Sequence, residues 1–485
     1  MAVHSLVEAL SATAAHAPDH PALVHRDETV GYRDLLRRAG QAAAGLDHLT
    51  PGGGTLGLRA AKSPDSIAAV LACLGRGRPV LLPSVELGEV TLAHLLATAG
   101  CVAGPTTELV MAAGTVGLPL AGGPADPDAV ALLLTTSGST GVPKVVPLSF
   151  GAVDRFTDWA GVRFGLGPDS VVLNHSPLNF DLCLLDIWAT LKHGGTVVLV
   201  DPARGTDGRH LGRLIDDHGV TLVQGVPMLF RQLADAGGQH PSVQDVLLTG
   251  ESTPVRLLRR LPELFPNARF HDVYGCTETN DSLVRRLDEH DLADGVTALG
   301  EPLPGVAVLV VGDDGRVLTG EGVGELCVST PFQTAGYLDA RLDEAKFTGH
   351  PEGADDRRYF RSGDLVRRTP EGRLVLLGRT DLQVKVRGVR TNLADVEHVL
   401  GDHSAVAEAV VVAVPDPVAG HVLHAEVRRA PGVALDGLEA RRHCADRLPR
   451  TAVPSTFRIS DDPIPRTSTG KPDRRKLLTT RTAKD

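Results

Sequence analysis

Residues 132–147 read LLLTTSGSTGVPKVVP, and this stretch does more than any other to define the fold and the chemistry of the chain. The apolar run at its start has the composition of a buried strand. The run leads into a loop in which Gly138 and Gly141 lack a Cβ, so backbone N–H groups can turn toward an anion. Serine and threonine hydroxyls add neutral donors, and Lys144 adds a positive charge. We therefore predict a strand followed by a loop that holds a triphosphate.

A flexible Gly/Ser surface loop is the alternative for any cluster of this composition. The alternation of hydroxyl residues with glycines, the terminal Pro143–Lys144 pair and the preceding strand favour the phosphate loop. The pattern is not GxxxxGK[ST], because the glycine spacing and the last position differ. The residues expected to contact the nucleotide here are Thr136, Ser137, Gly138, Ser139, Thr140, Gly141 and Lys144.

Strand-like and helical stretches alternate on both sides of this loop. Such alternation predicts an α/β fold, with a large N-terminal domain of stacked, largely parallel sheets and helices. Strands are expected at residues 130–134, 171–174, 196–200, 221–223 and 246–248, and helices at residues 182–191 and 210–217.

The pattern of apolar and turn residues changes twice toward the C-terminus. Short β-like segments at residues 306–311, 315–318 and 324–328, broken by Asp and Gly turns, predict a small β-rich subdomain over about residues 300–379. The last hundred residues predict a small α+β domain of their own. Its expected elements are a hairpin at 381–390, helices at 393–400 and 438–448, and strands at 407–414 and 424–427. We therefore divide the chain into an N-terminal core, 1–379, and a C-terminal domain, 380–485.

Composition narrows the function classes. A chain of 485 residues with 42% hydrophobic positions predicts more than one domain. The net charge of −10 gives no excess of basic residues that would bind nucleic acid, so we expect no nucleic-acid partner. The six cysteines form no CxxC pair, so neither a zinc site nor a redox dithiol is expected. The N-terminal residues do not resemble a signal peptide, and no apolar run reaches the roughly 18 residues that span a bilayer. We expect a soluble cytoplasmic protein with no membrane partner.

The loop TSGSTGVPK resembles, over all nine positions, the phosphate loop of the adenylate-forming superfamily. That family includes acyl-CoA synthetases, luciferases and the adenylation domains of nonribosomal peptide synthetases. Val145 stands where a glycine is usual and Phe150 replaces a frequent histidine, but neither position is a core catalytic group. The resemblance extends over almost the whole chain. It implies a large domain hinged to a small, mobile one, and the pattern is most like a free-standing amino-acid adenylation enzyme.

Two further motifs resemble the nucleotide site of that family. Residues 249–252 read TGES, and the resemblance implies that Gly250, Glu251 and Ser252 line the adenine. Residues 272–278 read DVYGCTE, with Asp272 in place of the usual asparagine at the adenine edge and Cys276 where proline is commonest. An aromatic face stacks on a base and a carboxylate suits magnesium. The resemblance accordingly places Tyr274 on adenine, Thr277 at the α-phosphate and Glu278 on Mg²⁺, with Val273 and Gly275 beside the nucleotide.

The remaining motifs follow in the family's order. Asp364, in the segment YFRSGD, resembles the ribose ligand, and a carboxylate can accept from both ribose hydroxyls. Arg379 would contact ribose or phosphate, and Asp381 would be the hinge. Lys471, in the segment STGKPDR, resembles the mobile catalytic lysine. Each segment alone would be an ordinary turn or a basic tail. Together they imply ATP and Mg²⁺ as cofactors and the catalytic residues Thr140, Thr277, Glu278 and Lys471.

The Phe180–Asp181 pair matches family members that activate amino acids, where the aspartate binds the α-ammonium of the substrate. The alternative is that Asp181 is the N-cap of the next helix. The family's substrate-binding positions become Asp181, Leu182, Leu185, Gln224, Leu247, Thr249, Val273, Asp281, Ser282 and Lys471. A purely aliphatic substrate would leave the polar members of this set unpaired. We therefore expect a small or medium amino acid with a polar side chain, cationic ones included.

The expected reaction is ATP-dependent formation of an aminoacyl-AMP with release of pyrophosphate. Transfer to the phosphopantetheine thiol of a separate carrier protein would follow, since no carrier segment follows Lys471. Such a reaction is typical of nonribosomal peptide and antibiotic biosynthesis. Two alternatives stay open. One is an acyl- or aryl-CoA ligase that acts on an amine-free acid, and the other is a non-catalytic nucleotide-binding protein.

Overall fold

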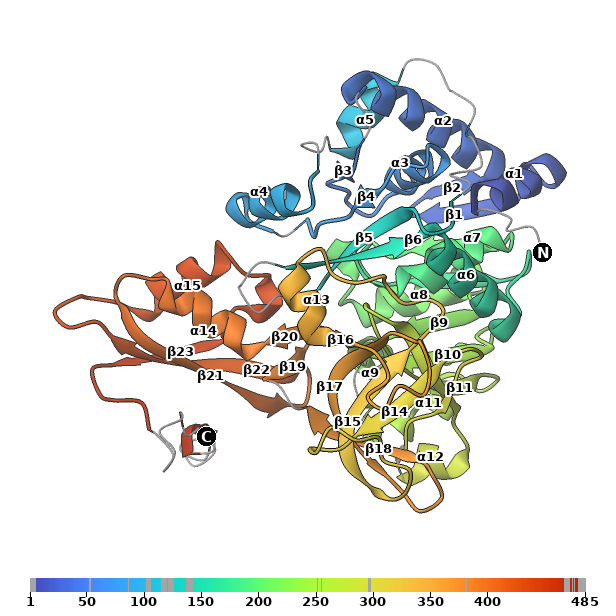
Figure 1. Cartoon of the computed structure of the whole chain (residues 1–485). Helices are drawn as coiled ribbons and strands as arrows, with labels where there is room; N and C mark the ends of the chain where they lie inside the picture. Colours follow the sequence, from blue (N-terminus) through green and yellow to red (C-terminus); the bar gives the residue numbers. More distant parts are fainter. Residues whose placement is uncertain are drawn as a thin grey trace. The chain divides into compact units, whose positions relative to one another are not determined.

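The computed structural model describes most of the chain (Figure 1). The described residues are 6–51, 54–85, 87–101, 106–114, 120, 126–136, 143–250, 252–253, 255–294, 298–379, 382–465, 472, 474 and 476–478. They belong to two compact units. The first comprises Met1–Val85, Thr98–Thr135 and Val145–Thr380, and the second comprises Glu86–Ala97, Thr136–Lys144 and Asp381–Asp485.

A nine-stranded sheet is the centre of the first unit, in the order β13-β12-β11-β10-β9-β7-β8-β1-β2. The six strands from β11 to β1 are parallel, and antiparallel strands lie at both edges. The strands are β1 (Pro21–His25), β2 (Glu28–Gly31), β7 (Val171–Asn174), β8 (Thr196–Leu199), β9 (Leu222–Gly225), β10 (Asp245–Thr249), β11 (Arg269–Cys276), β12 (Asn280–Arg286) and β13 (Glu301–Pro302). This arrangement confirms the predicted α/β class.

Apolar residues occupy both faces of this sheet. In β7, Val172 belongs to one core cluster and Leu173 to the other. The same alternation continues in β9, where Leu222 and Val223 face opposite clusters. Parallel strands covered on both faces read as continuous apolar runs, which is why the sequence showed these strands clearly.

Helices cover both faces. Helices α2, α3 and α6 contribute to the first cluster, and α8, α9 and α11 to the second. The helices of this unit are α1 (Leu6–His16), α2 (Tyr32–Leu49), α3 (Pro64–Gly75), α5 (Thr107–Ala113), α6 (Phe150–Phe164), α7 (Thr190–Lys192), α8 (Gly208–His218), α9 (Pro227–Ala236), α10 (Val255–Leu258), α11 (Leu261–Leu264), α12 (Glu289–Asp294), α13 (Ala340–Lys346) and the 3₁₀ turn η2 (Pro202–Arg204), while α4 (Glu89–Thr98) lies mostly in the second unit. Among the described residues, no helix combines the length and the hydropathy needed to cross a membrane.

The helix predicted at residues 182–191 is a π-helix for most of its length. The π-helix η1 spans Leu184–Ala189 and continues into α7. Every residue of η1 is buried, including Asp186. A π-helix widens the backbone ring, and such segments occur mostly at functional sites. The apolar periodicity alone could not distinguish it from an α-helix.

A smaller, four-stranded sheet has the order β3-β4-β5-β6. Its strands are β3 (Leu56–Gly57), β4 (Val80–Leu81), β5 (Val130–Thr136) and β6 (Lys144–Ser149). Strands β5 and β6 are neighbours, as Figure 1 shows, and the predicted phosphate loop connects them. The strand predicted at residues 130–134 is therefore confirmed and extends by two residues.

The β-rich subdomain is a five-stranded antiparallel sheet in which β14, β15, β17 and β16 are consecutive neighbours and β18 pairs with β17. The strands are β14 (Ala307–Val311), β15 (Gly322–Ser329), β16 (Phe347–Thr348), β17 (Tyr359–Arg368) and β18 (Leu374–Arg379). The segment predicted at residues 315–318 is wrong as a strand. Gly315 takes a φ of +77° in a turn, and only an isolated bridge from Val317 to Val311 follows.

In the second unit, α14 and α15 pack on a three-stranded sheet of β21, β22 and β23 (Figure 1). The elements are the hairpin β19 (Gln383–Val386) and β20 (Val389–Asn392), α14 (Leu393–Gly401), β21 (Val406–Asp416), β22 (Gly420–Arg429), α15 (Gly437–Ala445), η3 (Arg450–Ala452) and β23 (Thr456–Ser460). The predicted hairpin, both predicted helices and both predicted strands are confirmed, with small differences in their bounds. Strand β23, parallel to β22, was missed.

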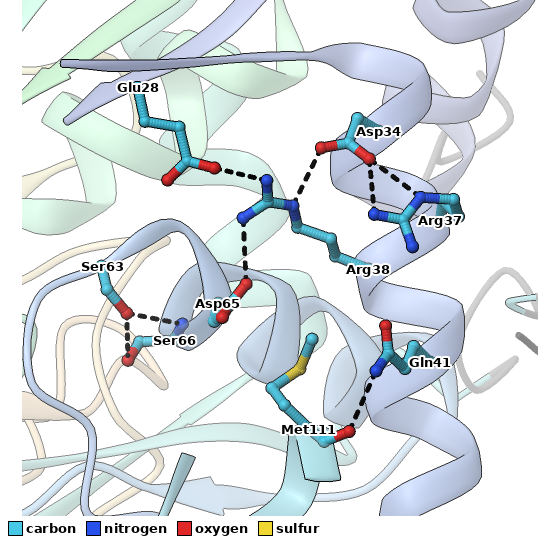
Figure 2. Close-up of polar contacts among 9 residues, drawn as sticks. All are labelled: Glu28, Asp34, Arg37, Arg38, Gln41, Ser63, Asp65, Ser66 and Met111. Atoms are coloured by element: carbon cyan, nitrogen blue, oxygen red, sulfur yellow. Dashed lines mark hydrogen bonds and ion pairs between the residues drawn. The ribbon is translucent and has the colours of Figure 1, made fainter. Parts of the chain in front are cut away.

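A guanidinium hub joins three elements of the first unit, as Figure 2 shows. Arg38 on α2 donates to Glu28 of β2 (2.5 Å), to Asp34 one turn earlier (2.9 Å) and to Asp65 in the first turn of α3 (3.1 Å). Its side chain is 18% exposed. Arg37, the next residue along α2, also bonds to Asp34 but is 61% exposed.

Replacing Arg38 with Gln should destabilise the first unit because three carboxylates lose their shared donor. We expect the free energy of unfolding to fall by about 1–2 kcal/mol, a range that allows for the screening of partly exposed partners. Urea unfolding followed by tryptophan fluorescence measures it, since both tryptophans, Trp159 and Trp188, lie in this unit. Arg37→Gln is the matched control, with an expected change within about 0.5 kcal/mol. Equal losses for the two variants would contradict the hub.

Candidate active site

The predicted phosphate loop is described only at its two ends. Strand β5 ends at Thr136 and β6 begins at Lys144. The candidate residues Ser137, Gly138, Ser139, Thr140 and Gly141 lie outside the described residues, as do Glu251, Asp381 and Lys471. Their assigned roles stay predictions.

The end of β10 turns sharply after Thr249. Gly250 has a φ of +88°, in the left-handed region that side chains disfavour, which accounts for a glycine at this position. Thr249 is buried, whereas Ser252 is exposed. The turn therefore brings backbone to the carboxyl end of the sheet, where ligands of open α/β sheets bind.

A tight loop joins β11 to β12 and carries Thr277 and Glu278. Asn280 closes it with a φ of +54° and donates through Nδ2 to the Phe332 carbonyl (2.7 Å). Asn tolerates this left-handed conformation better than most residues. At Gly275 a Cβ would lie only 2.4 Å from the Asn280 carbonyl oxygen, so the hairpin requires a glycine there. The loop is thus held in one shape by its own sequence.

Glu278 is 1% exposed and its carboxylate is oriented by a residue that the sequence analysis missed. The Tyr337 hydroxyl donates to Oε1 of Glu278, and the Thr334 amide donates to the Glu278 carbonyl (3.0 Å). Tyr337 is one of four tyrosines in the chain and follows β15 by eight residues. The small number of tyrosines was the only signal in the sequence that could have pointed to Tyr337, because nothing in the spacing links this residue to Glu278.

Tyr274 and Asp364 meet across two sheets. The Tyr274 hydroxyl donates to Oδ2 of Asp364 (2.5 Å), and burial together with this carboxylate holds the pKa of Tyr274 well above its usual range. The Asp364 amide donates in turn to Ser362 Oγ (3.0 Å). Arg379, the last residue of β18, is the register partner of Asp364. The structure therefore brings together three of the residues predicted to contact the nucleoside.

The two faces of β11 have different surroundings. Tyr274 packs against the core of the β-rich subdomain, whereas Val273 belongs to the large core cluster on the opposite face. Asp272 is on the Tyr274 side, because alternate residues of a strand share a face. One strand therefore carries Asp272 and Tyr274, predicted to contact the nucleotide, on one face. On the other face it carries Val273, which is predicted to contact both the substrate and the nucleotide.

Neighbouring strands place the predicted substrate residues on one face of the sheet. Gln224 pairs in register with Leu247, and Thr249 pairs with Val273. Val172 of β7 pairs with Leu222, so Asn174 and Gln224 lie at the same level two residues further on. All of these positions face the large core cluster, together with Leu185 of η1.

A β-bulge in β12 adds Asp281 to this face. Val284 pairs with Val273 and Asp281 pairs with Gly275, and the register shifts between those two pairs. Residues 273 and 275 share a face, so residues 281 and 284 share it as well, although they are three positions apart. Bulges re-aim side chains in this way and often occur beside functional sites. Strict alternation would have turned Asp281 to the other face.

The two polar residues at the bulge differ in their bonding. Ser282 is fully buried, and its hydroxyl donates to the Asn280 carbonyl (3.2 Å) and contacts Thr279 Oγ1 (3.1 Å). Asp281 is 9% exposed, and its Oδ2 has no hydrogen-bond partner among the described residues. Burial and the nearby Asp181 raise the pKa of Asp281 to about 7.

A buried polar network, which the sequence analysis also missed, underlies this face. Asn174 Nδ2 donates to Oδ2 of Asp186 (3.1 Å), and Asp186 is 0% exposed. Lys62 donates to the carbonyls of Asn174 (3.1 Å) and His175 (2.9 Å). Burial lowers the pKa of Lys62 to about 8 and raises that of Asp186 well above its usual range.

Asp181 is partly buried and precedes this π-helix. The N-cap position of η1 is Cys183, so Asp181 is not its N-cap. The carboxylate influences the pKa of both Asp281 and Cys183. Leu182, beside it, is likewise only partly buried.

Comparison with known proteins decides the family. The AMP-binding enzyme family matches residues 10–338, and the C-terminal domain of AMP-binding enzymes matches residues 395–471. The chain belongs to the AMP-binding enzyme family. The adenylate-forming resemblance and the enzyme class predicted from the sequence are therefore confirmed.

Curated proteins similar to this chain include a phenyloxazoline synthase and a prolyl-carrier protein ligase. Phenyloxazoline synthase MbtB of Mycobacterium sp. (strain MCS) is 33% identical over 96% of this chain and 41% of its own length. The L-proline–[L-prolyl-carrier protein] ligase of Streptomyces coelicolor is 36% identical over 72% of this chain and 66% of its own length. The chain thus spans less than two thirds of either relative.

A solved structure of similar fold supports the architecture. A variant of o-succinylbenzoate CoA synthetase from Bacillus subtilis is 25% identical, with a TM-score of 0.85 over 97% of this chain and 98% of that one. The two-domain α/β architecture is therefore that of adenylate-forming enzymes.

Replacing Tyr337 with Phe should disorient the Glu278 carboxylate while removing only one hydroxyl group, so that no large cavity forms. A hydrogen bond to a charged group contributes about 1.5–3 kcal/mol. With Glu278 as the predicted Mg²⁺ ligand, we expect the Mg²⁺ concentration for half-maximal ATP–pyrophosphate exchange to rise about 10-fold or more. A purely structural role would lower activity without changing this Mg²⁺ dependence.

Tyr359→Phe is the control for Tyr337→Phe. Its hydroxyl donates to Asp355 (2.9 Å) in the same subdomain, and Asp355 is an exposed carboxylate. We expect the Mg²⁺ dependence of this variant to match that of the unmodified protein. A shift of equal size in both variants would refute the role of Tyr337.

Replacing Asp281 with Asn should stabilise the first unit at high pH. The folded-state pKa of Asp281 is raised to about 7, so the folded state binds the proton more tightly than the unfolded state does. The contribution of Asp281 to the free energy of unfolding therefore falls as pH rises from about 4 to 7. Above pH 7 this contribution is fully unfavourable. We expect Asp281→Asn to gain about 1–3 kcal/mol at pH 8 and little at pH 4, by urea unfolding at both pH values. A loss of stability at pH 8 would show that the carboxylate has a structural partner.

Proposed function

We propose that this protein activates an amino acid with ATP as an aminoacyl-AMP and then transfers the aminoacyl group to the phosphopantetheine thiol of a separate carrier protein. In the first step a carboxylate oxygen attacks the α-phosphorus, the bond from that phosphorus to the bridging oxygen breaks, and pyrophosphate leaves. In the second step the thiol sulfur attacks the acyl carbon, the thiol loses its proton, and AMP leaves with the electron pair of the acyl–oxygen bond.

The proposal rests on the different surroundings of the two faces of β11. Tyr274, which is bonded to Asp364, faces the nucleotide side, and Val273 faces the side of Gln224, Thr249 and Asp281. The strand then ends in the loop of Thr277 and Glu278. An acid bound on one face and a nucleotide bound on the other would therefore meet at this loop, where proximity does most of the catalysis.

Glu278 is the residue that would hold Mg²⁺. A buried carboxylate oriented by a tyrosine hydroxyl fits a hard cation that prefers oxygen ligands. When bound, the cation would neutralise charge on the phosphates. Thr277, beside it, would donate to the α-phosphate.

Asp181 supports an amino acid over an amine-free acid. It is partly buried, lies within electrostatic range of Asp281 and is not the N-cap of η1. A carboxylate in such surroundings favours a cationic partner, which the α-ammonium of an amino acid supplies. The L-prolyl-carrier protein ligase relative supports both an amino acid and a carrier as partners. The CoA synthetase neighbour keeps CoA as the alternative acceptor.

We assign the positive charge at the reacting centre to Lys471. This lysine belongs to the C-terminal domain of residues 380–485, which we propose to be mobile, with Asp381 as its hinge. Two anions, a carboxylate and a triphosphate, must approach each other, so a positive charge between them is the main requirement. A hinged domain would bring Lys471 in for the first step and withdraw it for the second.

The substrate side chain is assigned as small or medium and polar, cationic ones included. Leu185, Leu247 and Val273 are buried and apolar, whereas Gln224, Thr249 and Asp281 are buried and polar. An aliphatic side chain would leave the second group unpaired.

ATP–pyrophosphate exchange across a panel of amino acids and amine-free acids tests this function. We expect exchange with at least one polar amino acid, and a loss of about 100-fold or more in Asp181→Ala because a buried ammonium loses its counter-charge. Lys471→Ala is the inactive control and should retain ATP binding. Exchange supported only by amine-free acids, with Asp181→Ala unaffected, would favour the CoA ligase. Exchange with only leucine, valine or phenylalanine would refute the polar side chain.

A further inference from the structure

Buried acceptor oxygens gather on the substrate side of the sheet. Among the described residues, no donor reaches Oδ1 of Asn174, Oδ1 of Asp186, Oε1 of Gln224 or Oδ2 of Asp281. Each of these side chains is at least nine-tenths buried. Leaving a buried acceptor unpaired is strongly unfavourable, and native structures retain few such atoms. Acceptors without donors in one region point to a ligand that brings N–H groups.

These acceptors are positioned by the fold. Asn174 and Gln224 lie at one level on adjacent parallel strands, and Asp186 reaches Asn174 from η1. The bulge in β12 turns Asp281 to the same face. Asp186 and Asp281 are near enough to repel each other, as are Asp281 and Asp181. The four acceptors and Asp181 therefore belong to one region.

The charges of this region do not balance within the protein. Lys62 is buried, and its charge together with the bond from Asn174 lowers the pKa of Asp186, although burial keeps that pKa well above its usual range. Asp181 is assigned to the α-ammonium of the substrate. No lysine, arginine or histidine in the described part of the chain forms an ion pair with Asp281, and the carboxylate that acts on it most is the repulsive Asp181. The negative charge of Asp281 is therefore not matched by a cation of the described residues.

We infer that Asp281 binds a second cationic group, so that the substrate is a diamino or guanidino acid held at its α-ammonium by Asp181 and at its side chain by Asp281. This inference rests on the proposed function. Gln224 Oε1 and the acceptors beside Asp186 take the remaining N–H groups of the side-chain cation. Leu185, Leu247 and Val273 pack against the methylene groups that separate the two charges.

Pairs of amino acids that differ only in the side-chain charge test it. The pairs are L-lysine with L-norleucine, L-ornithine with L-norvaline, and L-arginine with L-citrulline. In ATP–pyrophosphate exchange with the full chain, the cationic member of at least one pair should exceed its neutral partner by about 100-fold or more in kcat/KM. The pair with the largest ratio then distinguishes an ammonium from a guanidinium and sets the length of the side chain.

Asp281→Asn keeps the shape of the side chain and removes its charge. It should cut the ratio for the preferred pair by about 10-fold or more, chiefly by lowering kcat/KM for the cationic member. Retention of ATP binding and of the fluorescence-detected unfolding transition shows that the variant is folded. Asp288→Asn, in the exposed loop after β12, is the control and should leave the ratio unchanged.

The outcomes separate this inference from the function on which it rests. Neutral members that are activated as well as the cationic ones, or a ratio that survives Asp281→Asn, would overturn the second-cation site while amino-acid activation stands. Exchange with amine-free acids alone, or with no acid at all, would overturn both.

Discussion

The parallel alignment of β7, β9, β10 and β11 brings four strand ends to one edge of the central sheet, and the candidate site depends on that alignment. Each strand contributes a polar residue or a glycine turn at its carboxyl end. The same strands are apolar at their centres on both faces. Burial of the centres fixes the register, and the register places the polar ends within reach of each other.

At this edge of the sheet, the stability of the fold and the proposed function make opposite demands on Asp281. Burying Asp281 next to Asp181 without a cation is unfavourable, which its raised pKa of about 7 expresses directly. Asp186 has partners that Asp281 lacks, a bond from Asn174 and the attraction of Lys62, although burial still raises the pKa of Asp186 well above its usual range. Within the described part of the chain, the fold therefore supplies a cation near one buried carboxylate and none near the other. Large packed cores on both sides of the sheet offset the unfavourable burial.

Much of the fold could be predicted from the sequence because its strands are buried on both faces. Strand β7 has the predicted bounds, and β10 differs from its prediction by one residue at each end. The sequence did not reveal where the backbone geometry departs from regular periods. The π-helix η1 has the apolar pattern of an α-helix, and the bulge at Asp281 changes the strand period at a single residue. Neither leaves a signal in the order of residue types.

Side-chain partners were the hardest features to predict. The motif containing Glu278 was apparent, but its partner Tyr337 lies 59 residues further along the chain and is joined to it only by the packing of the β-rich subdomain. The same holds for Tyr274 and Asp364, which are separated by 90 residues. Both tyrosines bond to carboxylates, one predicted to bind metal and the other ribose. The β-rich subdomain supplies one partner to each pair, so its packing against β11 sets the geometry of both. A substitution that loosened this packing would disturb the predicted metal and ribose ligands together while leaving Asp281 and Gln224, on the opposite face of the sheet, in place.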